Sequence, residues 1–386
     1  MTYDSALFDS AQIYLEIDPT LQAQSWQHSQ GFATASSCWN AYINELCLGT
    51  VLDWLREEYD AHATPSPSTI ALANLWEFVN GSAVMVQGMR LILLPVETID
   101  TDELRVPQEW VDLANWVGDY YLAVQVNLDE AWIRINGFIR HQQLKAKAQY
   151  DWSDRTYSLD EVNLISNLNA LWVARQLCPE EVTRAEVEPL PFLTAAQADS
   201  LMQRLSNPAI ILPRLAVPFQ QWGALVAHDG WRQQLMEHRR GLPEQRSLRQ
   251  WLQSGISAFA QQVGWQQIEF QPSLASARGD IALAPLALAS PLTINQQPYE
   301  LLISLINSDA NIWRFELRSQ KLGGLIPAEF TLRLLTEDLQ TFDGNEDTAI
   351  ANVDRLYVEV ALEPGEGLVW EVDPQPDAYI KEILRF

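Results

Sequence analysis

The sequence predicts an α+β protein with an N-terminal antiparallel meander or small barrel and packed helices, a helical Arg-rich middle segment and a C-terminal β-sandwich. Three observations lead to this prediction. The 386 residues exceed what one hydrophobic core usually supports. Helical apolar spacing gives way to short alternating runs along the chain, and turn residues recur between the runs of the last third. We expect domains at 1–180 and 266–386, joined by a linker and helical segment at 181–265.

The first element is a helix that Ser36 or Ser37 can cap and that runs to about Asp60. Large apolar residues form its broad apolar face: Trp39, Ile43, Leu46, Val51, Leu52 and Leu55. Four acids fall on the other side: Glu45, Asp53, Glu57 and Asp60. The spacing therefore predicts a helix that packs on a sheet and carries its carboxylates away from the core.

Two Asn-Gly dipeptides, Asn80-Gly81 and Asn136-Gly137, predict tight hairpin turns because both residue types tolerate positive φ. Strands are expected around them at 75–79, 83–87, 89–94, 120–126, 131–135 and 138–144. A helix within 159–177 is expected to close this domain.

The middle of the chain begins with a Glu- and Pro-rich linker at 179–191. Helices are expected at 194–205, 222–240 and 247–263. They carry most of the arginines of this region: Arg232, Arg239, Arg240, Arg246 and Arg249. The last third contains five short runs typical of sandwich strands, at 299–306, 312–318, 330–335, 357–362 and 368–372.

The acids are concentrated at the two ends of the chain. Residues 1–130 hold 19 acids and three arginines, and the whole chain has a formal charge of −25. Direct binding of nucleic acid is improbable, because phosphate contacts require clustered Lys and Arg. An acidic surface suits a basic protein partner, which it attracts over a distance. Solubility alone is the alternative explanation for the charge.

Composition also indicates the compartment. The longest apolar run, 281–289, is interrupted by Pro285 and is far too short to span a bilayer. The first residues carry Asp4 and Asp9 and do not resemble a secretory signal. Three cysteines are too few for a disulfide framework, which favours a reducing compartment. The expected location is the cytoplasm.

Catalytic signatures are mostly missing: no phosphate-binding Gly-rich loop, HExxH, nucleophile elbow or CxxC occurs. His141 ends an expected strand and is interpreted as structural. The best carboxylates for acid–base chemistry lie between a strand and a helix: Asp151, Asp154, Asp160 and Glu161. They support an alternative hypothesis, a carboxylate-dependent hydrolase or glycan-binding protein, which requires two convergent acids, one with a raised pKa.

A short acidic turn, Asp343 to Asp347, resembles the start of a calcium loop. Thr348 stands where an EF-hand needs Gly, and Asp354 stands where it needs a bidentate Glu. We therefore expect no cofactor and no metal, and the sequence leaves open whether this turn binds a cation.

Several segments resemble the cyanobacterial domain of unknown function 1822 family. The similar stretches are 39–55 (WNAYINELCLGTVLDWL), 75–83 (LWEFVNGSA), 90–95 (RLILLP), 106–126, 154–160 (DRTYSLD) and 362–372 (LEPGEGLVWEV). The resemblance implies no enzyme activity and no cofactor. It implies, through neighbouring genes, a regulator that sequesters a sigma factor of the extracytoplasmic-function class.

Together these observations favour a non-enzymatic regulatory protein that binds a basic partner, with an anti-sigma factor as the specific form. The expected contact residues are Glu45, Asp53, Glu57, Asp60, Arg239 and Arg240. A scaffold subunit of a larger assembly is the third hypothesis, and it predicts a large exposed apolar patch.

Overall fold

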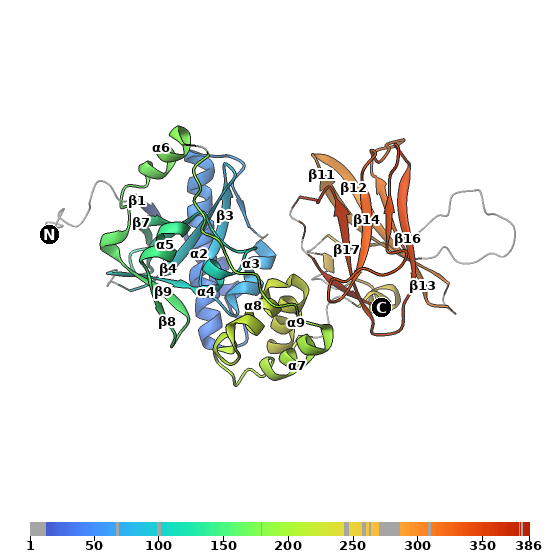
Figure 1. Cartoon of the computed structure of the whole chain (residues 1–386), viewed down its shortest axis with the longest axis horizontal. Coiled ribbons are helices and arrows are strands. Elements are labelled where there is room, and N and C mark those ends of the chain that lie inside the picture. Colours follow the sequence, from blue (N-terminus) through green and yellow to red (C-terminus); the bar gives the residue numbers. More distant parts are fainter. Residues whose placement is uncertain are drawn as a thin grey trace. The chain divides into compact units, whose positions relative to one another are not determined.

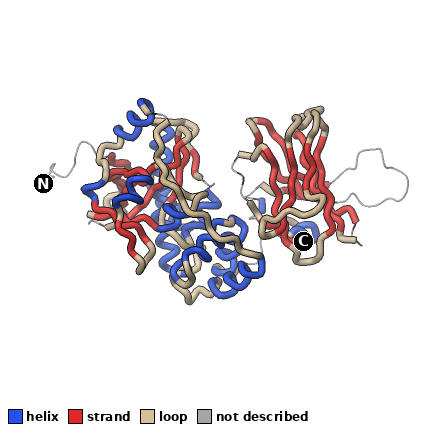
Figure 2. The backbone as a smooth tube through the Cα atoms, viewed as in Figure 1, coloured by secondary structure: helices blue, strands red, loops and turns tan. Residues whose placement is uncertain are grey.

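A computed structural model describes residues 13–66, 69–98, 102–178, 180–242, 247–256, 260–261, 264–269, 286–307, 310–377, 379 and 381–386 (Figure 1). The chain groups into two compact units. The first is drawn from residues 1–193 and 198–241, and the second from residues 194–197 and 242–386. The first unit mixes helices and strands, whereas strands dominate the second (Figure 2). The α+β class is therefore confirmed.

A six-stranded sheet in the order β1-β7-β6-β4-β3-β2 forms the centre of the first unit. Its strands are β1 (Ile13–Glu16), β2 (Thr64–Pro65), β3 (Ser82–Val86), β4 (Met89–Val96), β6 (Tyr120–Asn127) and β7 (Trp132–Arg140). Neighbours are antiparallel except for β4 and β6, which are parallel. The sheet is thus mixed, whereas the sequence predicted a purely antiparallel arrangement of these strands, as a meander or small barrel. Most residues of β4 and β6 are buried, as expected for strands covered on both faces.

The long helix α2 (Ala35–Glu58) packs across this sheet. Thr34 caps it: its hydroxyl oxygen accepts a hydrogen bond from the Ser37 N–H, and Ser37 pairs back with the Thr34 N–H. The cap therefore lies just before the predicted serines. Trp39, expected on the apolar face, is 41% exposed and packs edge-on against Trp26. The helix α1 (Pro19–Ser29) lies against α2.

Neither Asn-Gly pair forms a hairpin. The first expected strand, at 75–79, is instead the end of the helix α3 (Thr69–Trp76) and the turn after it, and Gly81 leads from this turn into β3. The turn between β3 and β4 is instead made by Gln87 and Gly88, both at positive φ. Gly137 lies inside β7, where the backbone of Ile165 comes so close that a Cβ would be 2.9 Å from its oxygen. Gly81 therefore belongs to the connection between α3 and β3, and Gly137 allows the backbone at Ile165 to approach β7 closely.

Smaller elements complete the first unit. A three-stranded sheet has the order β5-β9-β8, with β5 (Glu103–Pro107), β8 (Gln149–Asp151) and β9 (Thr156–Asp160). The helices are α4 (Gln108–Asp112), α5 (His141–Lys147), α6 (Asn169–Leu177), α8 (Phe219–Ala227), α9 (Asp229–Arg239) and most of α7 (Ala195–Leu205). The helix α8 and the Arg-bearing helix α9 thus group with the first unit.

The Glu- and Pro-rich segment, here called the strap (residues 180–193), has no regular secondary structure. Both oxygens of the Asp119 carboxylate accept hydrogen bonds from the Arg184 guanidinium, at 2.9 and 2.8 Å. The Ala185 N–H donates to Nδ1 of His141 at 3.0 Å. These contacts fix the strap to α5 and to the turn before β6.

His141 makes the stability of the first unit depend on pH. Its side chain is buried, and Nδ1 accepts the strap hydrogen bond, so the ring proton lies on Nε2 and faces the Val111 carbonyl at 3.0 Å. Burial lowers the pKa of His141. The hydrogen bond to Val111 and the negative charge of Asp112 raise this pKa, and the positive charges of Lys145 and Arg184 lower it. A lowered folded-state pKa gives stability that is full above the unfolded pKa of about 6.5 and is lost as pH falls.

We expect the free energy of unfolding of the wild type to fall more steeply below about pH 6.5 than that of His141→Gln. Urea denaturation at a series of pH values measures both slopes. His238 lies exposed on α9, so His238→Gln should keep the wild-type slope. Equal slopes in the wild type and His141→Gln would contradict the assignment.

The second unit contains two antiparallel sheets. One has the order β10-β11-β12-β13-β16, with β10 (Gln266–Glu269), β11 (Leu286–Ile294), β12 (Gln297–Asn307), β13 (Ile312–Ser319) and β16 (Arg355–Ala361). The other has the order β15-β14-β17-β18, with β14 (Thr331–Thr336), β15 (Glu346–Thr348), β17 (Gly367–Asp373) and β18 (Ile383–Arg385). Residues of both sheets and of α10 (Leu248–Ser254) share one core, including Ile303, Leu332 and Trp251.

Candidate partner-binding groove

A groove of about 580 Å³ lies between β1, the start of α1 and the C-terminal half of α2. Its lining consists of Tyr14, Leu15, Glu16, Asp18, Thr20, Leu21, Gln24, Thr50, Asp53, Trp54 and Glu57. Four of these residues are acidic and none is basic. The groove therefore combines carboxylates with aromatic and aliphatic walls.

The four acids come from three elements that the fold brings together. Glu16 ends β1, and Asp18 is the N-cap of α1, whereas Asp53 and Glu57 lie on α2. All four are exposed. Hydrogen bonds from the backbone N–H groups of Leu21 and Thr20 lower the pKa of Asp18, so its carboxylate is charged at neutral pH.

The acids on α2 stand where they weaken the helix. Asp53 and Glu57 are four residues apart on one face, where like charges repel. Glu57 and Glu58 occupy the last turn, at the negative end of the helix dipole. The cation of that turn, Arg56, is 3.7 Å from Asp53 in an exposed ion pair, which offsets little of this cost. Folding stability does not explain this arrangement.

Two of the predicted contact acids lie outside the groove lining. Glu45 faces α1, where its Oε1 is 2.8 Å from Nδ1 of His28. Asp60 follows α2 and accepts hydrogen bonds from the backbone N–H groups of Gln87 and His62, at 2.8 and 2.9 Å. These bonds lower the pKa of Asp60. Asp60 thus holds the turn between β3 and β4.

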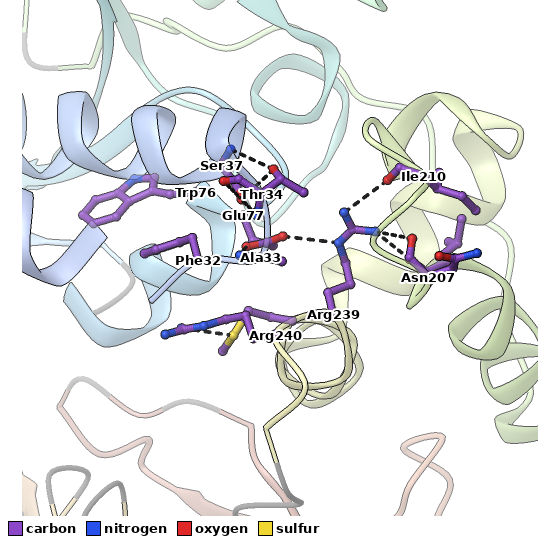
Figure 3. A network of polar contacts seen from close by, with 12 residues as sticks. Phe32, Ala33, Thr34, Ser37, Trp76, Glu77, Asn207, Ile210, Arg239 and Arg240 are labelled. Carbon is purple, nitrogen blue, oxygen red and sulfur yellow. Dashed lines mark hydrogen bonds and ion pairs between the residues drawn. The ribbon is translucent and has the colours of Figure 1, made fainter. Parts of the chain in front are cut away.

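Arg239 and Arg240 lie near the N-terminal end of α2, whereas the groove lies at its C-terminal half (Figure 3). Arg239 is 3% exposed; its Nε donates to Glu77, and its other nitrogens donate to backbone carbonyls, including that of Leu205 at 2.9 Å. The Arg240 guanidinium lies 5.0 Å from the centroid of the Phe32 ring, and burial lowers its pKa. Arg239 offers no surface to a partner, and neither arginine lines the groove.

Two of the carboxylates considered for hydrolysis, Asp151 and Asp154, accept hydrogen bonds from one arginine. Arg105 donates to Asp151 and Asp154, both at 2.8 Å, and to Glu103 at 2.7 Å. Hydrogen bonds from Ser153 and Arg105 lower the pKa of Asp151 to about 2. A general acid needs the opposite shift, so Asp151 does not fit that role.

Three residues of the acidic turn at Asp343 to Asp347 form hydrogen bonds with other residues of the second unit. The Asn345 amide donates to the Leu334 carbonyl at 2.7 Å, Glu346 accepts from Arg333 at 2.7 Å, and Asp347 accepts from the Tyr357 N–H at 3.0 Å. Within the described residues, no group of three or more His, Cys, Asp or Glu side chains is placed to hold a metal ion.

Two of the predicted contact residues, Asp53 and Glu57, line the groove, whereas Tyr14, Glu16 and Asp18 were not predicted. These three reach Asp53 only because β1 pairs with β7 and α1 packs against α2. Asp18 before Pro19 is a typical helix start, and this signal could have indicated α1.

Comparison with known proteins identifies one family. The family described as "Protein of unknown function (DUF1822)" matches residues 15–385. No curated protein and no solved structure matches the chain. The arrangement of its own side chains is therefore the basis on which a function can be argued.

Proposed function

Since the chain belongs to the DUF1822 family, whose description assigns no activity, we propose from its own geometry that it binds a positively charged segment of another protein. The observation that carries this proposal is the groove in which Glu16, Asp18, Asp53 and Glu57 converge without a lining base. Lysine or arginine side chains of a partner would supply the missing charge.

The walls of the groove favour a basic protein segment as the ligand, rather than a free metal ion or a small cation. Leu15 and Leu21 can pack against the aliphatic stems of lysine and arginine while the charged ends reach the carboxylates. Tyr14 and Trp54 add aromatic surface, which attracts cations. The net negative charge of the chain would speed the encounter with such a partner.

A regulatory role follows if the basic segment is one that otherwise binds a polyanion, because the two acidic ligands then compete for it. The partner that we propose to test first is a sigma factor of the extracytoplasmic-function class. In this form the protein is an anti-sigma factor, and it acts by occluding a promoter-binding surface without catalysis.

The proposal has two further parts. We infer that the second unit is a β-sandwich, because its two antiparallel sheets share one core. We also infer a cytoplasmic location, because Cys38, Cys47 and Cys178 are all free. Among the described residues no helix has both the length and the apolar character needed to cross a bilayer.

Titration with a synthetic peptide of alternating lysine and alanine tests the binding proposal. We expect Asp53→Asn with Glu57→Gln to weaken binding about two- to thirty-fold at low salt, since each exposed ion pair contributes about 0.2–1 kcal/mol. High salt should reduce this difference, because the Debye length falls to about 3 Å at 1 M.

The matched control removes the same charge elsewhere. Glu97 and Asp160 are exposed and lie outside the groove lining, so Glu97→Gln with Asp160→Asn should bind almost as the wild type does. Equal losses in the two double variants would show that net charge and not the groove attracts the peptide.

A further inference from the structure

A second cavity, of about 630 Å³, lies under the strap in the first unit. Its floor is formed by α4, α5 and β9, one wall by strap residues Glu186 to Leu190, and one end by the start of α8. The volume is in the range usual for sites that bind small molecules. This cavity shares no lining residue with the acidic groove.

The floor presents one fixed cation. The Asp112 carboxylate accepts hydrogen bonds from Nζ of Lys145 at 2.8 Å, from the Tyr157 hydroxyl at 2.8 Å and from the Gln108 amide at 3.0 Å. Burial and Asp112 raise the pKa of Tyr157, so its phenol keeps its proton as the donor to Asp112. An ammonium group has three donors, and the bond to Asp112 uses one of them. Lys145 is held in place with donors left for a ligand.

The strap wall presents the opposite charge. Glu186 and Glu188 line the cavity and are exposed, and no ion pair is found for either in the described part of the chain. Leu190 lies beside them, packed so close to α8 that a Cβ on Gly223 would be 3.2 Å from its side chain. Phe219 closes the end of the cavity. An apolar patch therefore adjoins the two carboxylates.

We propose that this cavity binds a zwitterion with an apolar body, namely a free α-amino acid with a large apolar side chain. The ligand carboxylate would accept hydrogen bonds from Lys145, and the ligand ammonium group would meet Glu186 and Glu188. Its side chain would pack on Leu190 and Phe219. A purely cationic ligand would leave the free donors of Lys145 unused, and a purely anionic ligand would face three carboxylates, those of Asp112, Glu186 and Glu188, so the lining discriminates against both.

Calorimetric titration of the full chain tests the proposal with three related compounds: L-phenylalanine, phenethylamine and 3-phenylpropionate. We expect L-phenylalanine to bind and each of the two analogues, which lack one charged group, to bind at least tenfold more weakly. Phenethylamine binding as tightly as L-phenylalanine would overturn the role of Lys145. Absence of binding by L-phenylalanine would overturn the site.

Variants locate the site. Lys145→Gln should weaken phenylalanine binding at least tenfold, whereas Lys147→Gln, which removes an exposed lysine of the same helix outside the lining, should not. If Lys145→Gln fails to fold, Glu186→Gln with Glu188→Gln on the exposed strap provides the same test. Unchanged binding in these variants would contradict the proposal. Loss of peptide binding in the groove should leave phenylalanine binding intact.

Discussion

Replacing Arg214 with Met is expected to lower the free energy of unfolding of the first unit by about 3–5 kcal/mol, because it leaves a buried carboxylate without its charge partner. Arg214 lies in a short 3-10 turn, and its guanidinium grips Glu109 with two hydrogen bonds, at 2.9 and 2.6 Å. The Glu109 side chain is fully buried, and it also accepts a hydrogen bond from the Trp222 indole N–H at 2.7 Å.

Two comparisons separate the lost charge partner from the lost side chain. Arg204 is exposed and donates to the Ala216 carbonyl, so Arg204→Met should cost less than about 1 kcal/mol. Adding Glu109→Gln to Arg214→Met should restore much of the stability, since no buried charge remains. Urea denaturation followed by tryptophan fluorescence measures all three variants. A loss below about 1 kcal/mol for Arg214→Met would contradict the prediction.

This ion pair also shows why the domain division was difficult to predict from sequence. Arg214 follows the strap and Glu109 lies in α4, so the pair joins positions 105 residues apart inside one unit. The Glu- and Pro-rich composition of 179–191 predicted a linker between domains. The segment instead packs on the first unit, because Arg184 and Ala185 bond to Asp119 and His141.

The spacing of apolar residues predicted the helix and the strands in which that spacing is regular. The α2 helix and the strands β12, β13, β14, β16 and β17 were expected close to their observed positions. Pairing partners were not predictable in the same way. The strands β4 and β6 are mostly apolar, and such runs do not reveal whether a neighbour is parallel or antiparallel.

Charge and helical spacing predicted contact residues on α2 but could not rank them. Asp53 and Glu57 follow one face of α2, and the structure places both in the groove lining. Asp60 and Arg239 were predicted as contact residues too, yet Asp60 holds the turn between β3 and β4. Arg239 donates to the Leu205 carbonyl at the end of α7. Sequence does not show whether a charge already has an internal partner.

The acids of the groove lead to a final prediction, in which binding and stability change in opposite directions. Glu57→Lys should raise the free energy of unfolding by about 0.5–1.5 kcal/mol, since it places a cation at the negative end of the α2 dipole and four residues after Asp53. The same variant should bind the lysine-alanine peptide more weakly than the wild type, because it replaces a carboxylate of the groove with a cation that repels the peptide.

Glu58 provides the matched control, because it occupies the same last turn but does not line the groove. Glu58→Lys should stabilise the helix through its dipole alone, by about 0.3–1 kcal/mol, and retain most of the peptide affinity. Denaturation and titration of the same preparations measure both quantities. If the two variants lose affinity equally, general charge and not the groove binds the peptide. If neither variant is stabilised, the acids of α2 carry no cost for folding, and the argument that they are retained for binding fails.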